Sequence, residues 1–271
     1  MDLLTRDLHH KRDVMIKGIA FQINEFLNEV EKKEASIGKD RSQLQYLDKI
    51  FEEPWLTSCE QDSSIRLYRL AKRLIDISIA GFGLIIIVPV MVLIACLIKF
   101  DSSGPVIFRQ KRIGRNRRFH SNGHLIDRRN GNLKGKPFTI YKFRTMKQNV
   151  DRYAISPSDN FDPRLTRIGR IIRPLCLDEL PQLINVLKGD MSIVGPRPEM
   201  PFIVKNYGHL ESMRLAVKPG ITGLWQLYGS RKKQIHENLH YDMEYIKNRS
   251  LWLDLKIMIK TIGFMLDSKN V

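Results

Sequence analysis

The chain has 271 residues, and its 43% hydrophobic content is enough to build one or two domains with a packed core. Its formal net charge of +16 is unevenly spread, because residues 1–62 carry −4 and the remaining 209 residues carry +20. The three cysteines are widely spaced, which argues against a disulfide framework or a zinc site, and no recognition helix, zinc finger or aromatic sheet motif supports nucleic-acid binding.

The N-terminal part of the chain is acidic and amphipathic. Met1–Arg6 is followed by charged residues rather than by an apolar run, so we expect no secretory signal and a body that faces the cytoplasm. Between Ile19 and Val30, apolar residues recur at helical spacing, which predicts an amphipathic helix. We assign residues 1–65 to a helical extension of unknown role, which packs on the body, mediates dimerisation or contacts a partner.

The segment Ile75–Ile98 is almost wholly apolar and long enough to cross a membrane. Basic residues crowd both flanks, and positive flanks favour the cytoplasmic side, so a spanning helix would carry one basic cluster across the membrane. Pro89 lies near the middle of the segment and can bend or break a helix. Residues 66–103 are therefore predicted to form a re-entrant hairpin, and a single kinked spanning helix is the alternative.

The following part of the chain is basic and contains short strands. The residue pattern predicts strands at Pro105–Phe108 and Phe138–Phe143. Between them, the polar, glycine-containing stretch 120–136 predicts an exposed insertion. A basic body beside a membrane segment suits anionic lipid headgroups and phosphorylated substrates, whereas only the charge excess favours nucleic acid.

Two later segments are predicted to be amphipathic helices. From Arg164 to Arg173 an arginine recurs at every third residue, so the guanidinium groups share one helix face and can reach lipid phosphates. A solvated helix face is the alternative reading of these arginines. Ser250–Leu266 is too short and too charged to span a membrane, so we expect it along the membrane or in the core.

The adjacent carboxylates Asp178 and Glu179 come just before a predicted helix. Pro181 fits the first turn of this helix and Gly189 fits its end. The positive end of the helix dipole favours ionised carboxylates and nearby anions, and an ionised aspartate can attack phosphorus. By itself such a pair is most often an ordinary helix start. A second feature lies close by, because Arg197 sits in a stiff glycine-proline turn that suits bidentate phosphate contact.

Several long motifs occur in the same order as in one known family. From about Tyr68 to Leu266 the chain is similar to the bacterial sugar transferases, the monotopic polyprenyl-phosphate phosphoglycosyl transferases. The matching stretches are Lys72–Asp76, Gly104–Gln110, Tyr141–Met146, Leu177–Leu183, Gly189–Pro198 and Lys218–Gln226.

The resemblance implies a reaction and a set of site residues. A UDP-sugar gives its sugar-1-phosphate to polyprenyl (undecaprenyl) phosphate, which releases UMP and starts assembly of a surface glycan. Asp178 would be the nucleophile that forms a phosphosugar-aspartyl intermediate, and Glu179 would assist as a base or as a ligand of Mg²⁺ beside Asp178. The other implied site residues are Lys142, Arg173, Gln182 and Arg197 at the phosphates, and Pro196, Arg197 and Pro198 at the nucleotide.

The chain departs from the family pattern at two positions. Val88 replaces a common serine before Pro89, and Cys176 replaces a small hydroxyl residue, so the hydrogen bonds of those hydroxyl groups are lost. Asp242 and Tyr245 lie in a further family-like stretch, and we expect them to be structural.

These observations predict an α/β, predominantly helical protein with a re-entrant membrane helix-break-helix hairpin, amphipathic interfacial helices and a small catalytic domain over residues 104–271. By the resemblance it would be a monotopic protein of the bacterial cytoplasmic membrane, and its partners would be a UDP-sugar, polyprenyl phosphate, anionic lipids and a second copy in a homodimer. Two other hypotheses stay open, a non-catalytic scaffold of a glycan-assembly complex and a membrane-tethered nucleic-acid binder.

Overall fold

The computed structural model describes residues 63–116, 135–151, 153, 157, 161–228 and 239–266. The chain divides into two compact units, Met1–Pro54 and Trp55–Val271, and every described residue belongs to the second unit. The predicted N-terminal extension, apart from its last three residues, and the predicted insertion, apart from Gly135 and Lys136, lie outside the described residues.

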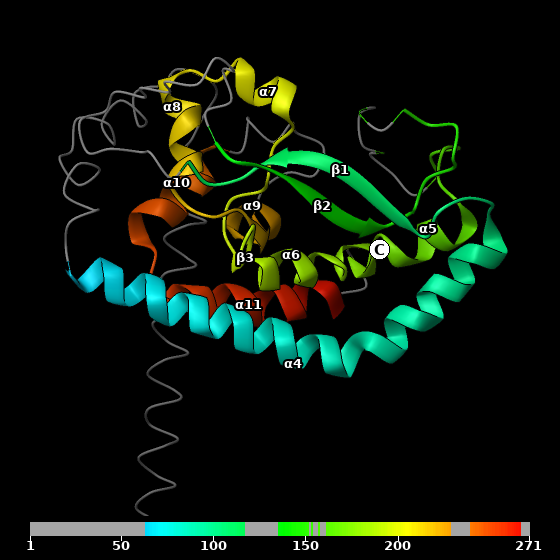
Figure 1. Cartoon of the computed structure of the whole chain (residues 1–271), viewed down its shortest axis with the longest axis horizontal. Coiled ribbons are helices and arrows are strands. Elements are labelled where there is room, and N and C mark those ends of the chain that lie inside the picture. Colours follow the sequence, from blue (N-terminus) through cyan, green and yellow to red (C-terminus); the bar gives the residue numbers. More distant parts are fainter. Residues whose placement is uncertain are drawn as a thin grey trace, which may run out of the picture. The chain divides into compact units, whose positions relative to one another are not determined.

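The described part is a mixed helical and sheet structure (Figure 1). Its two small sheets pair β1 (Ile107–Ile113) with β2 (Pro137–Phe143), and β3 (Ser192–Val194) with β4 (Gly220–Thr222). Its helical elements are α4 (Ser63–Asp101), α5 (Arg167–Ile172), the 3₁₀ turn η1 (Leu177–Glu179), α6 (Gln182–Lys188), α7 (Pro201–Lys205), α8 (His209–Ser212), the 3₁₀ turn η2 (Met213–Ala216), α9 (Leu224–Leu227), α10 (Leu239–Asn248) and α11 (Leu251–Leu266).

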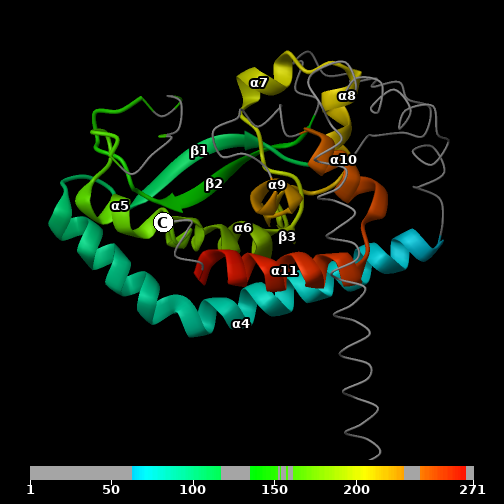
Figure 2. The same ribbon diagram turned by 180° about the vertical axis from the view of Figure 1, so that it is seen from behind.

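Helix α4 contains the predicted membrane segment. Its 39 residues correspond to a length of about 58 Å, and by length and composition it is the one helix in the described part that could cross a membrane. Only 11% of its apolar window is buried. The helix continues through Pro89 and bends along its length (Figures 1 and 2), so it does not confirm the predicted break. An interior proline removes one backbone hydrogen bond, which bends a helix without having to end it.

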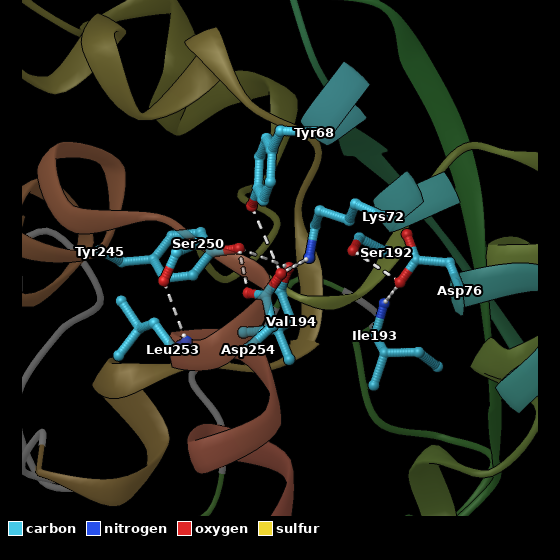
Figure 3. A network of polar contacts seen from close by, with 10 residues as sticks. All are labelled: Tyr68, Lys72, Asp76, Ser192, Ile193, Val194, Tyr245, Ser250, Leu253 and Asp254. Carbon is cyan, nitrogen blue, oxygen red and sulfur yellow. Dashed lines mark hydrogen bonds and ion pairs between the residues drawn. The ribbon is translucent and has the colours of Figure 1, made fainter. Parts of the chain in front are cut away.

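Both ends of α4 are tied to the same body. Near its start, Arg73 donates hydrogen bonds to two carbonyls in the last turn of α6, at 2.6 and 2.9 Å. The Asp76 carboxylate accepts from the Ser192 hydroxyl and from the next backbone N–H of β3, both at 3.0 Å (Figure 3). At the other end, Asp101 accepts from the Ile168 N–H in the first turn of α5, at 3.0 Å. Elements α5, α6 and β3 of the body therefore contact α4 on the two sides of its exposed apolar middle.

The antiparallel pair of β1 and β2 confirms the two predicted strands, with β1 longer than expected. The register places Ile107 opposite Phe143 and Ile113 opposite Pro137. Phe143 packs against Ile94 and other residues in the core next to the end of α4. Arg109 and Lys111 are exposed on either side of the buried Gln110, so this basic stretch can lie at the edge of the body as a strand.

The parallel pair of β3 and β4 is short and buried. Ser192 lies opposite Gly220, and Val194 lies opposite Thr222. A Cβ atom at Gly220 would collide with the backbone N of Gly195, so this close approach of two backbone segments requires glycine. The contact between Gly220 and Gly195 fixes the position of the backbone at the end of β3, directly before the turn that carries Arg197.

Of the two predicted amphipathic helices, the first is shorter than expected and the second covers the expected residues. Helix α5 covers only six residues, and Arg164 lies before it in an ion pair with Asp162, at 2.6 Å. Arg173 follows α5 and turns toward the carboxylates described below. Helix α11 covers the expected C-terminal stretch and lies beside α4 in both views (Figures 1 and 2), where Lys72 contacts Asp254 at 2.7 Å.

A polar network joins α4, α10 and α11 (Figure 3). The buried Asp254 carboxylate accepts a hydrogen bond from Lys72. It also accepts from the Tyr68 hydroxyl at 3.3 Å and from the Tyr245 hydroxyl at 2.8 Å. Burial, reinforced by this carboxylate, raises the pKa of Tyr245. Tyr245 thus holds α10 and α11 together, as expected for a structural residue.

A buried ionic cluster joins η2 to α10. The Arg214 guanidinium contacts the Asp242 carboxylate and lies 3.9 Å from Glu199, and it donates to the Tyr207 hydroxyl at 3.0 Å. The side chains of Arg214, Asp242 and Glu199 are all at most 2% exposed. Burial alone would lower the pKa of Arg214, but Asp242, Tyr207 and Glu199 raise it, so the guanidinium stays charged.

We expect Asp242→Ala to destabilise the protein by roughly 3–5 kcal/mol, because it leaves the buried Arg214 without its main counter-ion. Thermal unfolding in detergent micelles measures this loss. The control is Lys247→Ala on the exposed face of the same helix, which should change stability by less than about 0.5 kcal/mol. Equal effects of the two substitutions would contradict the structural role of Asp242.

Candidate functional site

The predicted carboxylate pair lies on a strained turn. Cys176 has a left-handed backbone conformation (φ 54°), and it is the one non-glycine residue with positive φ in the described part. Such a conformation costs free energy in a residue with a side chain and is often found at functional sites. The turn η1 follows directly, so Asp178 and Glu179 precede α6 as the sequence predicts. Gly189 ends α6 in the left-handed conformation (φ 82°), also as predicted.

Glu179 is paired with cations from two other elements. Its Oε1 accepts from Lys142 Nζ of β2 at 2.6 Å and lies 3.9 Å from Arg197 Nη2 in the loop after β3. Burial alone would raise the pKa of Glu179, but Lys142 and Arg197 outweigh burial and hold the pKa below its usual value. Glu179 is therefore an ionised carboxylate at neutral pH.

Asp178 has a different environment from its neighbour. It is 8% exposed, and no hydrogen-bond donor among the described residues reaches its carboxylate. Burial and the charge of Glu179 raise its pKa to about 6, although Lys142, Arg173 and Arg197 act in the opposite direction. Within the described part, Asp178 is thus a buried carboxylate without a hydrogen-bonded partner, and three cationic side chains act on it. Such a carboxylate can act as a nucleophile toward an anionic phosphate.

Arg197 is held in place by an aromatic ring. Its guanidinium lies over the Trp225 ring, 4.6 Å from the centroid, and Trp225 Nε1 donates to the Gly195 carbonyl at 3.2 Å. The backbone carbonyl of Arg197 also accepts from the buried Arg214, at 3.4 Å. Sequence reasoning did not single out Trp225, although it lies within the matching stretch Lys218–Gln226.

Two glutamine amides are buried beside the carboxylates. Gln182 is near enough to Glu179 to lower its pKa, but the Gln182 Nε2 group makes no hydrogen bond of good geometry. Gln226 donates through Nε2 to Cys176 Sγ at 3.6 Å, while its Oε1 has no partner. Gln182 was predicted as a phosphate-binding residue, and an unused N–H donor suits that role. Gln226 was not predicted, and its contact to Cys176 supports the turn before Asp178.

The structure brings most of the predicted site residues together. Burial lowers the pKa of Arg173, and its charge acts on both carboxylates, so Arg173 belongs to the site as well as to the row of arginines. Pro196 and Pro198 are buried on either side of Arg197. Pro89 is separate from this set, since it is an exposed residue of the membrane segment.

The carboxylates suit a metal ion that arrives with its substrate. Among the described residues, no group of three or more histidines, cysteines or carboxylates could hold a metal. Mg²⁺ is commonly bound by one or two carboxylates together with water and substrate phosphates. Asp178 and Glu179 supply that number of ligands, so the donor set fits Mg²⁺ bound with a diphosphate rather than a site formed by protein alone.

Comparison with known proteins agrees with this chemistry. Residues 67–268 match the family described as bacterial sugar transferase. The chain is 40% identical over 207 residues to the UDP-glucose:undecaprenyl-phosphate glucose-1-phosphate transferase of Escherichia coli K12, a match that covers 73% of this chain and 41% of the relative. It is 39% identical over 206 residues to the UDP-N-acetylgalactosamine-undecaprenyl-phosphate N-acetylgalactosaminephosphotransferase of Aeromonas hydrophila, covering 74% and 44%.

A shorter relative matches over most of its length. The exopolysaccharide production protein ExoY of Rhizobium meliloti is 35% identical over 208 residues, which covers 71% of this chain and 84% of that protein. The chain therefore spans less than half of the first two relatives and most of the third. Since the family match includes the membrane segment, the carboxylate turn and the Arg197 loop, this chain belongs to the bacterial sugar transferase family.

Proposed function

We propose that this protein transfers a sugar-1-phosphate from a UDP-sugar to polyprenyl phosphate, in bacteria undecaprenyl phosphate, and so begins assembly of a surface polysaccharide or glycoconjugate. The observation that carries the proposal is the buried Asp178 carboxylate, which lacks a hydrogen-bond donor in the described part and lies among three cationic side chains. The names of the relatives, which act on UDP-glucose or UDP-N-acetylgalactosamine and undecaprenyl phosphate, support the choice of donor and acceptor.

The reaction would proceed in two displacements at one phosphorus atom. An Asp178 oxygen attacks the phosphorus that carries the sugar, and the bond from this phosphorus to the bridging oxygen breaks, so UMP leaves with that oxygen and its electron pair. The resulting phosphosugar-aspartyl intermediate is a mixed anhydride (an acyl phosphate). An oxygen of polyprenyl phosphate then attacks the same phosphorus, and the bond from phosphorus to the Asp178 oxygen breaks, which releases the carboxylate. Neither step needs a co-reactant.

The surrounding side chains would position phosphates and neutralise their charge. Lys142, Arg173 and Arg197 act electrostatically on the Asp178 carboxylate, so a phosphate at that carboxylate would meet all three. Stacking on Trp225 keeps the Arg197 guanidinium in a fixed orientation for a phosphate or the nucleotide, and the rigid Pro196 and Pro198 preserve that orientation.

Glu179 would exchange partners when the donor binds. Its carboxylate is already ionised, so it can serve as a ligand of Mg²⁺ together with Asp178. Bound Mg²⁺ would supply charge neutralisation at the diphosphate and at the leaving UMP. Lys142 would then turn from Glu179 to the phosphate oxygens, which its single compact charge and flexible side chain allow.

The membrane part of the proposal is a re-entrant α4 with the body on the cytoplasmic side of the inner membrane. The contacts of Arg73 and Asp76 at one end and of Asp101 at the other favour this arrangement over a spanning helix, because all three bind the same body. Between these ends, Phe82, Ile85 and Ile86 are each at least 70% exposed, which suits burial in lipid. The donor site would then lie where a soluble nucleotide meets a lipid phosphate.

Incubation of the purified protein with polyprenyl phosphate, Mg²⁺ and a panel of UDP-sugars should release UMP, and chelation of Mg²⁺ should stop the release. We expect Asp178→Asn to lower kcat at least about a thousandfold, because an amide cannot replace the nucleophile. Asp190→Asn is the matched control, since Asp190 lies beyond α6 and pairs with Lys136 at 3.8 Å. Absence of UMP release with every donor would refute the proposed reaction. Full activity of Asp178→Asn would show that Asp178 is not the nucleophile.

The raised pKa of Asp178 predicts a pH profile. Only the ionised carboxylate attacks phosphorus, so kcat/KM for the UDP-sugar should rise about tenfold per pH unit below a midpoint near pH 6 and level off above it. The value to measure is kcat/KM for the UDP-sugar rather than for the acceptor, because the acceptor phosphate also titrates at about pH 6. Glu179→Gln removes a neighbouring negative charge and should move the midpoint to lower pH. If kcat/KM for the UDP-sugar did not change between about pH 5 and about pH 8, Asp178 would not be the titrating nucleophile.

The re-entrant arrangement predicts that both ends of α4 face the cytoplasm. With the native cysteines replaced by serine, single cysteines at Arg66 and Ser103 should react with a membrane-impermeant maleimide only after the cells are permeabilised, because both positions are exposed. Val90→Cys, in the apolar middle of α4, should stay unlabelled in either case. Labelling of one end but not the other in intact spheroplasts would show a spanning helix.

A further inference from the structure

Asn185 lies in the interior of α6, and none of its surface is exposed. Asparagine is unfavourable in a helix interior, because its side chain competes with the backbone for hydrogen bonds. Its amide group is polar, so burial of the side chain costs free energy unless both ends of the amide are paired. A buried asparagine at this position therefore needs specific partners.

Both ends of the Asn185 amide are paired with the backbone of β2. Its Nδ2 donates to the Thr139 carbonyl at 2.7 Å, and its Oδ1 accepts from the Tyr141 N–H at 3.1 Å. The other edge of β2 is paired with β1, so the amide binds the edge that β1 leaves open, as a further strand would. Helix α6 lies beside β2 in both views (Figures 1 and 2). One side chain thus fixes the position of the helix along the strand.

These two hydrogen bonds end next to Lys142. Successive side chains of a strand point to opposite faces, so Tyr141 and Lys142 leave β2 in opposite directions. The Tyr141 hydroxyl lies at the surface, whereas Lys142 Nζ donates to Glu179 Oε1 at 2.6 Å. Glu179 belongs to η1, and α6 begins three residues later, so Glu179 and Asn185 lie on one short segment. The contact of Asn185 with β2 therefore sets the position of Lys142 relative to the carboxylate turn.

The backbone of Asn185 makes separate hydrogen bonds. Its carbonyl accepts from the N–H groups of Asp190 at 3.0 Å and Met191 at 3.3 Å, which lead the chain out of α6 toward β3. Substitution of the side chain leaves this carbonyl in place. The contact with β2 can therefore be removed without removing the hydrogen bonds that end the helix.

We propose that Asn185 is a positioning residue for Lys142: its amide fixes β2 so that the lysine ammonium meets a phosphate at the carboxylate turn. The inference rests on the proposed transfer of a sugar-1-phosphate, in which Lys142 turns from Glu179 to phosphate oxygens. Phosphoryl transfer depends mainly on positioning and charge neutralisation, so a displaced cation slows it. A lysine side chain is flexible, and a fixed backbone limits the positions that its ammonium can take. Asn185 itself would touch no substrate atom.

Amine labelling tests the position of Lys142 without reference to activity. The full chain in non-ionic detergent micelles is treated with an amine-acetylating reagent, and peptide mass spectrometry compares the labelling rate of Lys142 with that of the exposed Lys147. Lys142 is only 17% exposed and paired with Glu179, so it should react slowly. In Asn185→Ala we expect its relative rate to rise at least about fivefold, because the ion pair opens more often. An unchanged rate would show that Asn185 does not position Lys142.

A double-mutant cycle tests whether this position matters for transfer. We expect Asn185→Ala to lower kcat/KM for the UDP-sugar about tenfold or more in the UMP-release assay. In the Lys142→Met background, the same substitution should change the value less than about twofold, because the group through which Asn185 acts is gone. Enzyme in excess over the donor keeps slow release measurable. A residue that only stabilised the fold would lower activity by the same factor in both backgrounds, so equal factors would overturn the inference.

Two further variants separate positioning from a general loss of folding. Asn185→Ser is the milder change, because its hydroxyl can bond within α6 but is too short to reach β2, and both measurements should move in the same direction as for Asn185→Ala. The control Ser212→Ala removes another buried bond between a side chain and the backbone, far along the chain from β2. It should leave the Lys142 labelling rate and kcat/KM unchanged. Equal losses in Asn185→Ser and Ser212→Ala would contradict a specific role.

The outcome can be separated from that of the proposed transferase activity. If the unmodified protein releases no UMP with any donor, the proposed reaction fails, and the labelling rates still decide whether Asn185 fixes Lys142. If UMP is released and Lys142 labelling rises in Asn185→Ala without loss of kcat/KM, the transferase stands and the role of Asn185 in transfer is wrong.

Discussion

Two adjacent carboxylates are buried in one short turn, and their burial is tolerated only because cations from distant segments meet them there. Like charges at neighbouring positions repel, and removal from water adds a further cost to each. Lys142 from β2 and Arg197 from the loop after β3 relieve that cost at Glu179, so Asp178 carries most of the remaining penalty. The positions of β2, η1 and the loop after β3 are thereby coupled, and the pKa values of the two carboxylates move in opposite directions.

The long helix α4 is attached to the body at both of its ends. Polar side chains near its start contact α6, and Asp101 at its end contacts α5, whereas the middle of the helix presents apolar side chains to the outside. Arg73 binds backbone carbonyls of α6, which follows the carboxylate turn, and Asp76 binds Ser192 and Ile193 of β3, which precedes the Arg197 loop. Helix α4 is therefore joined to the elements next to the carboxylate turn and next to the Arg197 loop.

The parts of the fold that sequence reasoning found are those with local signals. The strand at Phe138–Phe143 alternates, α6 has Pro181 before it and Gly189 after it, and α4 is an unbroken apolar run. The parts that it missed depend on partners far along the chain. Strand β1 extends to Ile113 through a basic stretch because β2 supplies its hydrogen bonds. The row of arginines predicted one helix, but Arg164 binds Asp162 instead and only six residues became helical.

The sequence alone determined the chemical inventory: an apolar segment bent by Pro89, an acidic pair in a turn before Pro181, and an arginine between two prolines. These are local properties, since periodicity, proline geometry and charge do not require knowledge of the partner. Only the tertiary structure decided which of the two carboxylates is paired with a lysine, because Lys142 lies 37 residues from Glu179 in the chain. It also decided the stacking of Arg197 on Trp225 and the buried pair of Arg214 and Asp242. Electrostatic environment is a property of distance in space, and no spacing along the chain encodes it.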